Sequence, residues 1–331
     1  MEKANRSKIV NHTLKYSSDL WDDNVIKLSL KKNMRVHLEK QKHPDDFEFH
    51  EQLENHEKWL LNLGEDNLIP YHTTDGSSIV EIPNKMCRES MEEVIESVFD
   101  NFDENIGNPE YFRKRILLAA TNEIVDECND NIVQKLKGDL HSFPSIDTVD
   151  DVDDSVMFPE EFLNKLSLSG LPQHMLKLKE NTVVILLRNM NIKNGHCNGT
   201  RYLVKHIGEY RLVLQKLNSN PGDKNRFLIL PRIPMVYGGK SFPFKLKRLQ
   251  FPIKIAFTLT INRAQGQSAS KCGILLPKSI WTHGQIYVAF SRCGNPNNIY
   301  VWAEQQQFHD LDLPQDKKFV KNVVYTEVIN K

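Results

Sequence analysis

The sequence has few cysteines and no long apolar run. Its five cysteines form no Cys-x-x-Cys pair and no even framework, so we expect neither a zinc finger nor a disulfide scaffold. No apolar stretch approaches the ~20 residues that a membrane span needs, and the first residues lack the apolar core of a signal peptide. A chain of 331 residues, 40% hydrophobic and 26% charged, therefore indicates about two globular, intracellular domains.

Acidic residues are absent from one long stretch. The 43 Lys and Arg balance the 43 Asp and Glu overall, but residues 224–303 hold 12 basic residues and no acid. Such a zone favours a polyanionic partner, either nucleic acid or a nucleotide triphosphate, over a solvated basic face. Residues 138–164 reverse the pattern with eight acids and no Lys or Arg, which predicts a mobile, solvated acidic loop.

A phosphate-binding loop of the form G-x-x-x-x-G-K-[ST] is also missing. Gly239-Lys240-Ser241 resembles its end, but Pro234 stands where the first glycine should be, and Pro243 prevents the helix that must follow. We interpret this segment as a β-turn. No metal site is expected either, because His43, His50 and His56 have no zinc spacing and are predicted on the surface, and Asp126-Glu127 is predicted on a solvated helix face.

The predicted secondary structure alternates between strands and helices, except in the middle of the chain, where only strands are predicted. Strand patterns cover 25–30, 115–120, 253–259, 272–276 and 298–302, and helices are predicted at 47–63, at 91–102, from 121 to 138 and at 283–292. Gly64 is predicted to end the first helix, and Ser90 to Glu93 forms a capping box for the second. Four short strands at 182–187, 201–206, 211–217 and 226–230 predict a small β-barrel inserted into an α/β layer.

Two polar segments carry the functional signal. Residues 256–268 begin as a strand and continue into a loop with Thr260, Asn262, Arg263, Gln265, Gly266 and Ser268. Polar groups after a strand lie where α/β sheets bind ligands. Residues 284–292 set Arg292 near the end of an apolar helix, where a planar, permanently charged guanidinium suits a phosphate. Taken alone, each signal is weak.

Together these segments resemble motifs V and VI of superfamily 1 DNA helicases, and most closely the PIF-family helicases of Helitron transposons. The same resemblance holds for residues 6–21 with Lys32-Asn33-Met34-Arg35 (motif IV), for 59–65, for 158–174, and for 186–189 with 197–201. Arg263 stands where lysine is common, and His196 where leucine is common. The resemblance extends over residues 6–302.

The resemblance implies a RecA-like second motor domain (2A) that carries an inserted β-barrel 2B domain. Residues 1–24 would belong to the junction with a first motor domain, 25–165 to the first part of 2A, 166–250 to 2B, and 251–331 to the return of 2A. The first domain would supply the phosphate-loop lysine and the Mg²⁺ ligands, which this sequence lacks.

Site residues also follow from the resemblance. Arg35 and Arg292 would be the catalytic arginines at the γ-phosphate of ATP, with Gln265 and Gly266 beside the nucleotide. Thr260, Asn262, Arg263 and Ser268 would contact single-stranded DNA, and residues 224–254 would add an electrostatic surface. The chain holds no metal ligand of its own.

Two functions therefore remain open. One is an ATP-dependent helicase that unwinds duplex DNA 5′ to 3′, with roles in DNA repair, recombination or telomere maintenance, in the nucleus or a mitochondrion. It would need a separate or upstream-encoded first RecA-like domain, and this chain alone is expected not to hydrolyse ATP. The alternative is a non-catalytic, single-stranded nucleic-acid-binding remnant of a transposon helicase. Neither reading needs a membrane.

The basic zone predicts salt-sensitive binding to single-stranded DNA. Because each neutralised phosphate releases counterions, affinity for an oligonucleotide should fall at least about tenfold between ~50 and ~200 mM salt. Fluorescence anisotropy at both salt concentrations measures this. Absence of binding at either concentration contradicts the polyanion interpretation.

Overall fold

A computed structural model describes residues 26, 33–68, 71–72, 77–149, 158–168, 170–220, 222–238, 244–277, 280, 282–304, 308, 311, 313–314 and 316–329. Predictions for 6–21, for most of 25–30 and for the turn at 239–241 lie outside these residues. The chain divides into two compact units, Met1–Val98 with Leu117–Thr121 and Thr260–Lys331, and Phe99–Ile116 with Asn122–Leu259. None of the described helices combines the length and apolar character that crossing a bilayer requires.

The first unit is an α/β layer. Its helices are α3 (Met34–Lys42), α4 (Phe47–Glu65), α5 (Met91–Val98), α11 (Gln285–Phe290) and α12 (Thr326–Ile329), with 3₁₀ turns at Asn84–Met86 and Pro296–Asn298. Its strands are β1 (Tyr71–His72), β2 (Ser78–Ile82), β15 (Lys271–Leu276), β16 (Ile299–Ala303) and β17 (Lys318–Asn322). The division between the units runs through β3 (Arg115–Ala119) and β14 (Thr258–Thr260).

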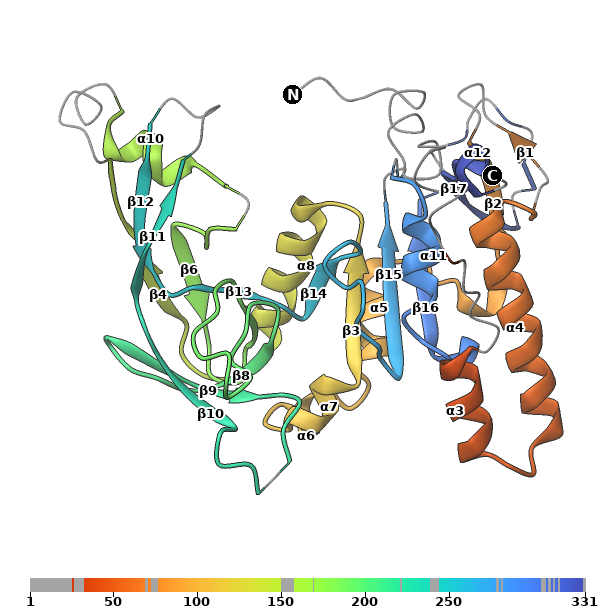
Figure 1. Ribbon diagram of the computed structural model, residues 1–331, viewed down its shortest axis with the longest axis horizontal. Coiled ribbons are helices and arrows are strands. Elements are labelled where there is room, and N and C mark those ends of the chain that lie inside the picture. Colours follow the sequence, from red (N-terminus) through yellow and green to blue (C-terminus); the bar gives the residue numbers. More distant parts are fainter. Residues whose placement is uncertain are drawn as a thin grey trace. The chain divides into compact units, whose positions relative to one another are not determined.

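The central sheet has the order β14-β3-β15-β16, and β15 and β16 are parallel with Cys272 opposite Ile299. Helix α5 lies beside β15 (Figure 1). Gly273 makes this close packing possible, because a Cβ there would lie 2.4 Å from Leu117 Cδ2 and 2.6 Å from Val94 Cγ1. A second sheet, β1-β2-β17, is antiparallel.

The second unit is rich in strands. Its helices are α6 (Phe102–Asn105), α7 (Pro109–Arg113), α8 (Asn122–Lys135) and α10 (Glu160–Lys165). Its strands are β4 (His141–Pro144), β5 (Ile146–Val149), β6 (Met175–Leu178), β7 (Val183–Leu186), β8 (Arg201–Ile207), β9 (Arg211–Lys216), β10 (Phe227–Pro231), β11 (Ile233–Tyr237), β12 (Leu246–Gln250) and β13 (Ile253–Ile255). They form sheets of order β10-β9-β8-β7-β13, β11-β12-β5 and β4-β6.

The α/β fold class and the strand-rich middle are confirmed. All four strands predicted between 182 and 230 are present as β7 to β10. The Ser90 cap is also present, since Glu93 N donates to Ser90 Oγ at 3.1 Å, but the Glu93 carboxylate accepts from Glu89 N (3.0 Å), one residue before the position that a capping box requires. The helix predicted at 121–138 is α8.

The predicted end of the first helix at Gly64 is wrong. Gly64 lies inside α4, which ends at Glu65, and the C-cap residue Asp66 adopts a left-handed conformation with φ 62°. The Asp66 carboxylate accepts hydrogen bonds from Ser78 Oγ (2.7 Å) and Asn322 Nδ2 (3.2 Å), and these contacts hold the unusual backbone in place. Gly64 instead makes room for the ring of Tyr287, whose nearest atom would lie 3.1 Å from a Cβ.

The single strand predicted over 253–259 is two strands, β13 and β14. The buried Asn129 side chain of α8 separates them, because its Nδ2 donates to Ile255 O (3.3 Å) and Thr258 O (3.2 Å) while its Oδ1 accepts from Thr258 N (2.9 Å). The neighbouring prediction for Asp126 also needs correction. It lies on α8, but it is half-buried and pairs with Lys254 at 2.8 Å.

The acidic segment 138–164 is not simply a solvated loop. It contains β4, β5 and α10, and Asp147 of β5 is buried against Arg248 of β12. Arg248 donates from Nε to Asp147 Oδ1 (2.8 Å) and from Nη2 to Oδ2 (2.6 Å), and its remaining donors reach the carbonyls of 163, 166 and 172. One ion pair thus ties β5 and β12 to α10 and the segment after it.

Substitution of Asp147 by Asn should strongly destabilise the second unit. The fully buried Arg248 would keep its charge without a counterion, which typically costs ~3–5 kcal/mol of unfolding free energy. Urea unfolding of D147N against the unchanged chain measures the loss. Asp139→Asn, at an exposed position nearby, is the control, and a loss below about 1 kcal/mol for D147N contradicts the account.

Candidate functional site

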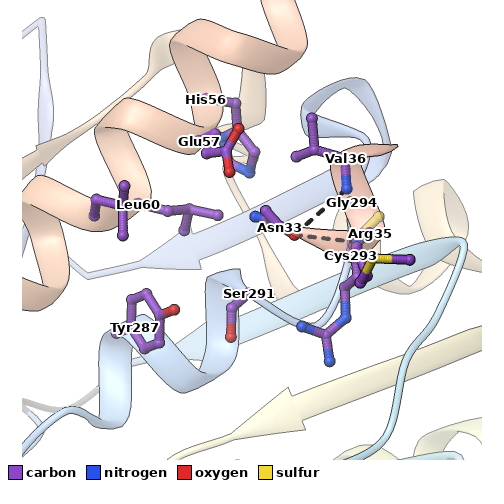
Figure 2. A pocket seen from close by; sticks show the side chains of 12 residues that line it. Asn33, Arg35, Val36, His56, Glu57, Leu60, Tyr287, Ser291, Cys293 and Gly294 are labelled. Atoms are coloured by element: carbon purple, nitrogen blue, oxygen red, sulfur yellow. Dashed lines mark hydrogen bonds between the residues drawn. The ribbon is translucent and has the colours of Figure 1, made fainter. Parts of the chain in front are cut away.

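The two arginines singled out by sequence lie on adjoining segments of the first unit. Arg35 is in the first turn of α3, which Asn33 caps by accepting from Arg35 N (3.1 Å) and Val36 N (3.4 Å). Arg292 follows the end of α11. Gly294 lies directly against Arg35, since a Cβ on Gly294 would be 3.3 Å from Arg35 Cβ. Figure 2 shows Arg35 beside Cys293 and Gly294.

Both guanidinium groups contact the same stretch of the loop after β14. Arg35 Nε donates to Ser268 Oγ at 3.0 Å, and Arg292 Nη1 donates to Gln267 O at 3.2 Å and to Ala264 O at 3.5 Å. Because Gln267 and Ser268 are consecutive, the structure brings Arg35, Arg292 and Ser268 together on one side of the unit. If the two guanidinium groups faced opposite sides of the unit, they could not bind the same ligand.

Arg292 is held rigidly. It is 7% exposed, its Nε donates to Val288 O at 2.7 Å, and its Nη2 donates to Ser291 Oγ at 2.8 Å. Burial lowers its pKa from the ordinary value, and the positive charge of Arg35 lowers it further. Burial of a charged side chain is costly, so these four hydrogen bonds are what keep this cation in place.

Within the part of the chain that the structure describes, neither arginine pairs with an acidic residue. Throughout the described ranges, no carboxylate lies within 4.0 Å of either guanidinium nitrogen. Two positive charges that repel each other without a counterion favour the binding of an anion. The donors fit a phosphate group, which accepts several hydrogen bonds from arginine forks. They do not fit Mg²⁺, which needs oxygen ligands.

A pocket of about 400 Å³ adjoins Arg35. Its wall combines α3, α4, α11 and the residues that follow α11, as Figure 2 shows; it is formed by Asn33, Met34, Arg35, Val36, His56, Glu57, Leu60, Leu61, Tyr287, Ser291, Cys293 and Gly294. The pocket lies wholly within the first unit.

His56 is the buried polar group of this pocket, which corrects its predicted surface position. It is 5% exposed, and its Nε2 has no hydrogen-bond partner among the described residues. Its ring stacks on Trp59 with centroids 5.8 Å apart, and Trp59 packs edge-on against Phe290 of α11 at 5.1 Å. Burial, with a smaller contribution from Lys85, lowers the pKa of His56 from 6.5 to about 4.

The residues predicted to face single-stranded DNA do not all lie together. Thr260 ends β14, is half-buried, and its carbonyl accepts from Arg263 N (3.0 Å) and Ala264 N (3.2 Å), so the chain turns at once. Asn262 and Arg263 are exposed at this turn, and so are Gln265 and Gly266. Ser268 differs from them, because its side chain bonds to Arg35.

The predicted basic surface of residues 224–254 is smaller than its charge suggests. Arg248 is fully buried with Asp147, and Lys254 pairs with Asp126. Arg232 donates to Pro144 O at 2.9 Å and lies over the Phe143 ring. Lys245 and Lys247 are exposed.

Within the ranges that the structure describes, no group of three or more His, Cys, Asp or Glu could hold a metal ion. The sequence analysis missed His56, Tyr287 and Gly294 as parts of the site. Only Gly294 carried a signal, its position two residues after Arg292.

Comparisons with known proteins point to one family. The family model of the 2B domain of DNA helicase Pif1 matches residues 161–207. The ATP-dependent DNA helicase Pif1 of Campylobacter jejuni is 42% identical over 199 residues, which cover 57% of this chain and 42% of that protein. The ATP-dependent DNA helicase PIF1 of Xenopus laevis is 27% identical over 194 residues, covering 56% of this chain and 27% of that protein.

The Pif1 helicase from Candida albicans superimposes with a TM-score of 0.45 at 20% identity, covering 64% of this chain and 53% of that one. The chain spans less than half the length of the two curated relatives described above.

The buried His56 predicts a pH-dependent stability. Folding favours the neutral ring, so the stability it provides is complete above pH 6.5 and is lost as pH falls toward 4. Between pH 7.5 and 5.0 this residue should remove about 2 kcal/mol of unfolding free energy. Urea unfolding at pH 7.5 and at pH 5.0 measures the difference in unfolding free energy, which should be about 2 kcal/mol smaller in His56→Gln than in the unchanged chain. The control is His141→Gln, at an exposed histidine, which should show the same difference as the unchanged chain. Equal pH dependence in H56Q and the unchanged chain contradicts the assignment.

Proposed function

Because the chain belongs to the PIF family of superfamily 1 DNA helicases, we propose that it acts as the second RecA-like motor domain, with its inserted 2B domain, of an ATP-dependent DNA helicase. The observation that carries this proposal is the convergence of Arg35 and Arg292 on residues 267 and 268, with no carboxylate partner among the described residues. Two such guanidinium groups suit the γ-phosphate of a nucleotide.

The two arginines have distinct tasks in this proposal. Bound ATP would supply the γ-phosphoryl group, and Mg²⁺ held by another domain would neutralise part of its charge. Arg292, fixed by four hydrogen bonds, presents its charge from a rigid position. Arg35 is half-buried at the pocket and has both Nη groups available among the described contacts. Phosphoryl transfer depends mainly on such positioning and charge, and an arginine in this role contributes ~10³–10⁵ in rate.

Single-stranded DNA is the proposed second ligand. The exposed Asn262 and Arg263 at the turn after β14 offer polar and cationic contacts to a strand. The loop that carries them is bonded to both arginines, so nucleotide and DNA would act on one segment. Closure and opening of two motor domains around ATP would then move the strand in steps, 5′ to 3′ in this proposal.

The domain organisation is part of the proposal. Residues 1–24 would form the junction with a first RecA-like domain, 25–165 and 251–331 the second motor domain, and 166–250 the 2B domain. The first RecA-like domain is the proposed partner, because it would supply the Mg²⁺ ligands and the phosphate-binding loop. Work on DNA would place the protein in the nucleus or a mitochondrion.

A second candidate function is a non-catalytic module that binds single-stranded nucleic acid. The absence of G-x-x-x-x-G-K-[ST] from this sequence favours it for the chain on its own. ATP hydrolysis distinguishes the two candidate functions, because only a motor that also has a phosphate-binding loop would hydrolyse ATP.

The proposed phosphate site predicts that Arg35→Ala weakens anion binding. A charge-assisted hydrogen bond contributes ~1.5–3 kcal/mol, so the affinity of the chain for tripolyphosphate should fall at least about tenfold. Isothermal titration calorimetry measures it. Arg113→Ala removes the same charge from an arginine that pairs with Glu110 and should bind as the unchanged chain does. Equal affinities for R35A and R113A, or no binding by the unchanged chain, contradict the proposed site.

A further inference from the structure

The side chain of Ser268 is bonded to Arg35, although Ser268 is as exposed as the turn at Asn262 and Arg263. Its Oγ accepts a hydrogen bond from Arg35 Nε at 3.0 Å, although 233 residues separate the two in sequence. An arginine has five N–H donors, and this contact uses the one nearest the stem. Both Nη groups of Arg35 make no other described hydrogen bond, so they stay available to a ligand at the pocket.

The contact fixes the plane of the guanidinium group. An arginine side chain is long and loses much rotamer freedom when it binds a ligand. A bond at Nε restrains the last torsion while leaving the two-pronged end of the fork unoccupied. Gly294 restrains the other end of the residue, because it packs against Arg35 Cβ and the Arg35 carbonyl carbon.

The segment that carries Ser268 is also joined to Arg292. Arg292 Nη1 donates to Gln267 O and Ala264 O, and Arg292 O accepts from Ala269 N at 3.0 Å. Residues 264–269 therefore contact both guanidinium groups through neighbouring positions. The same segment continues from the turn at Asn262 and Arg263.

We propose that Ser268 is a positioning residue for Arg35, which aims the Arg35 Nη groups at a bound polyphosphate and links that ligand to the loop 260–269. This assignment rests on the proposed function and replaces a strand-contacting role for Ser268. Its chemistry is that of a hydroxyl acceptor, so threonine can substitute for serine, whereas alanine cannot.

The link acts in both directions. If the Ser268 hydroxyl raises the affinity of Arg35 for an anion, a bound anion must strengthen the Arg35–Ser268 contact by the same factor. Polyphosphate binding therefore orders the loop that presents Asn262 and Arg263. A single neutral acceptor of this kind changes an equilibrium by about two- to tenfold.

The test is a double-mutant cycle on the full chain with tripolyphosphate as the probe. Ser268→Ala should weaken binding about two- to tenfold, and Ser268→Thr should restore it. The loss should disappear in the Arg35→Ala background, because Ser268 acts through Arg35. Ser270→Ala makes the same chemical change at an exposed serine two residues away and should leave binding unchanged.

Hydrogen exchange of residues 260–270 gives a second readout. Saturating tripolyphosphate should slow amide exchange there in the unchanged chain and in S268T, and should leave it unaltered in S268A. Two outcomes overturn the positioning role while the phosphate site stands. One is equal tripolyphosphate affinity of S268A and the unchanged chain. The other is a loss of affinity on Ser268→Ala that is the same with Arg35 present and in the Arg35→Ala background. No tripolyphosphate binding by the unchanged chain overturns the proposed function, and the positioning role with it.

Discussion

The site depends on two guanidinium groups that contact one loop. Neither group has a carboxylate partner among the residues that the structure describes. Arg35 and Arg292 come from opposite ends of the first unit's sequence, yet they contact residues 267 and 268. Each repels the other, and burial makes the charge of Arg292 still more costly. Such an arrangement is stable because backbone and hydroxyl oxygens accept from it, and it becomes more favourable when an anion adds negative charge.

The surrounding fold supplies the means to hold that arrangement. Helix α4 supports α11 through Trp59 and Phe290, and Gly64 leaves space for Tyr287 on the same interface. The absence of a side chain on Gly294 lets the first turn of α3 approach the residues after α11. Arg248 in the second unit shows the contrast. It is buried with Asp147, and all its described hydrogen bonds go to groups of the protein itself. Arg248 therefore stabilises the fold and is not a ligand-binding group.

Sequence was sufficient for much of the fold and insufficient for the partners of charged residues. The strands β7 to β10 and the helices α5 and α8 followed from periodicity and caps, which are local signals. The Asp147–Arg248 pair joins residues 101 positions apart, so no local pattern could show that an acidic stretch contributes to a core. The break between β13 and β14 comes from Asn129, and the burial of His56 comes from packing around α4. The roles proposed for Arg35 and Arg292 came from a resemblance in sequence, whereas their shared contact with one loop is visible only in the folded structure.

The measurement that tests the central claim most directly is a crystal structure of the chain grown with tripolyphosphate. The account predicts electron density for a phosphate group within hydrogen-bond distance of the Arg35 Nη groups and on the side of the loop that Arg292 holds. Density on the exposed Lys245 and Lys247 instead, with the space beside Arg35 empty, would contradict it.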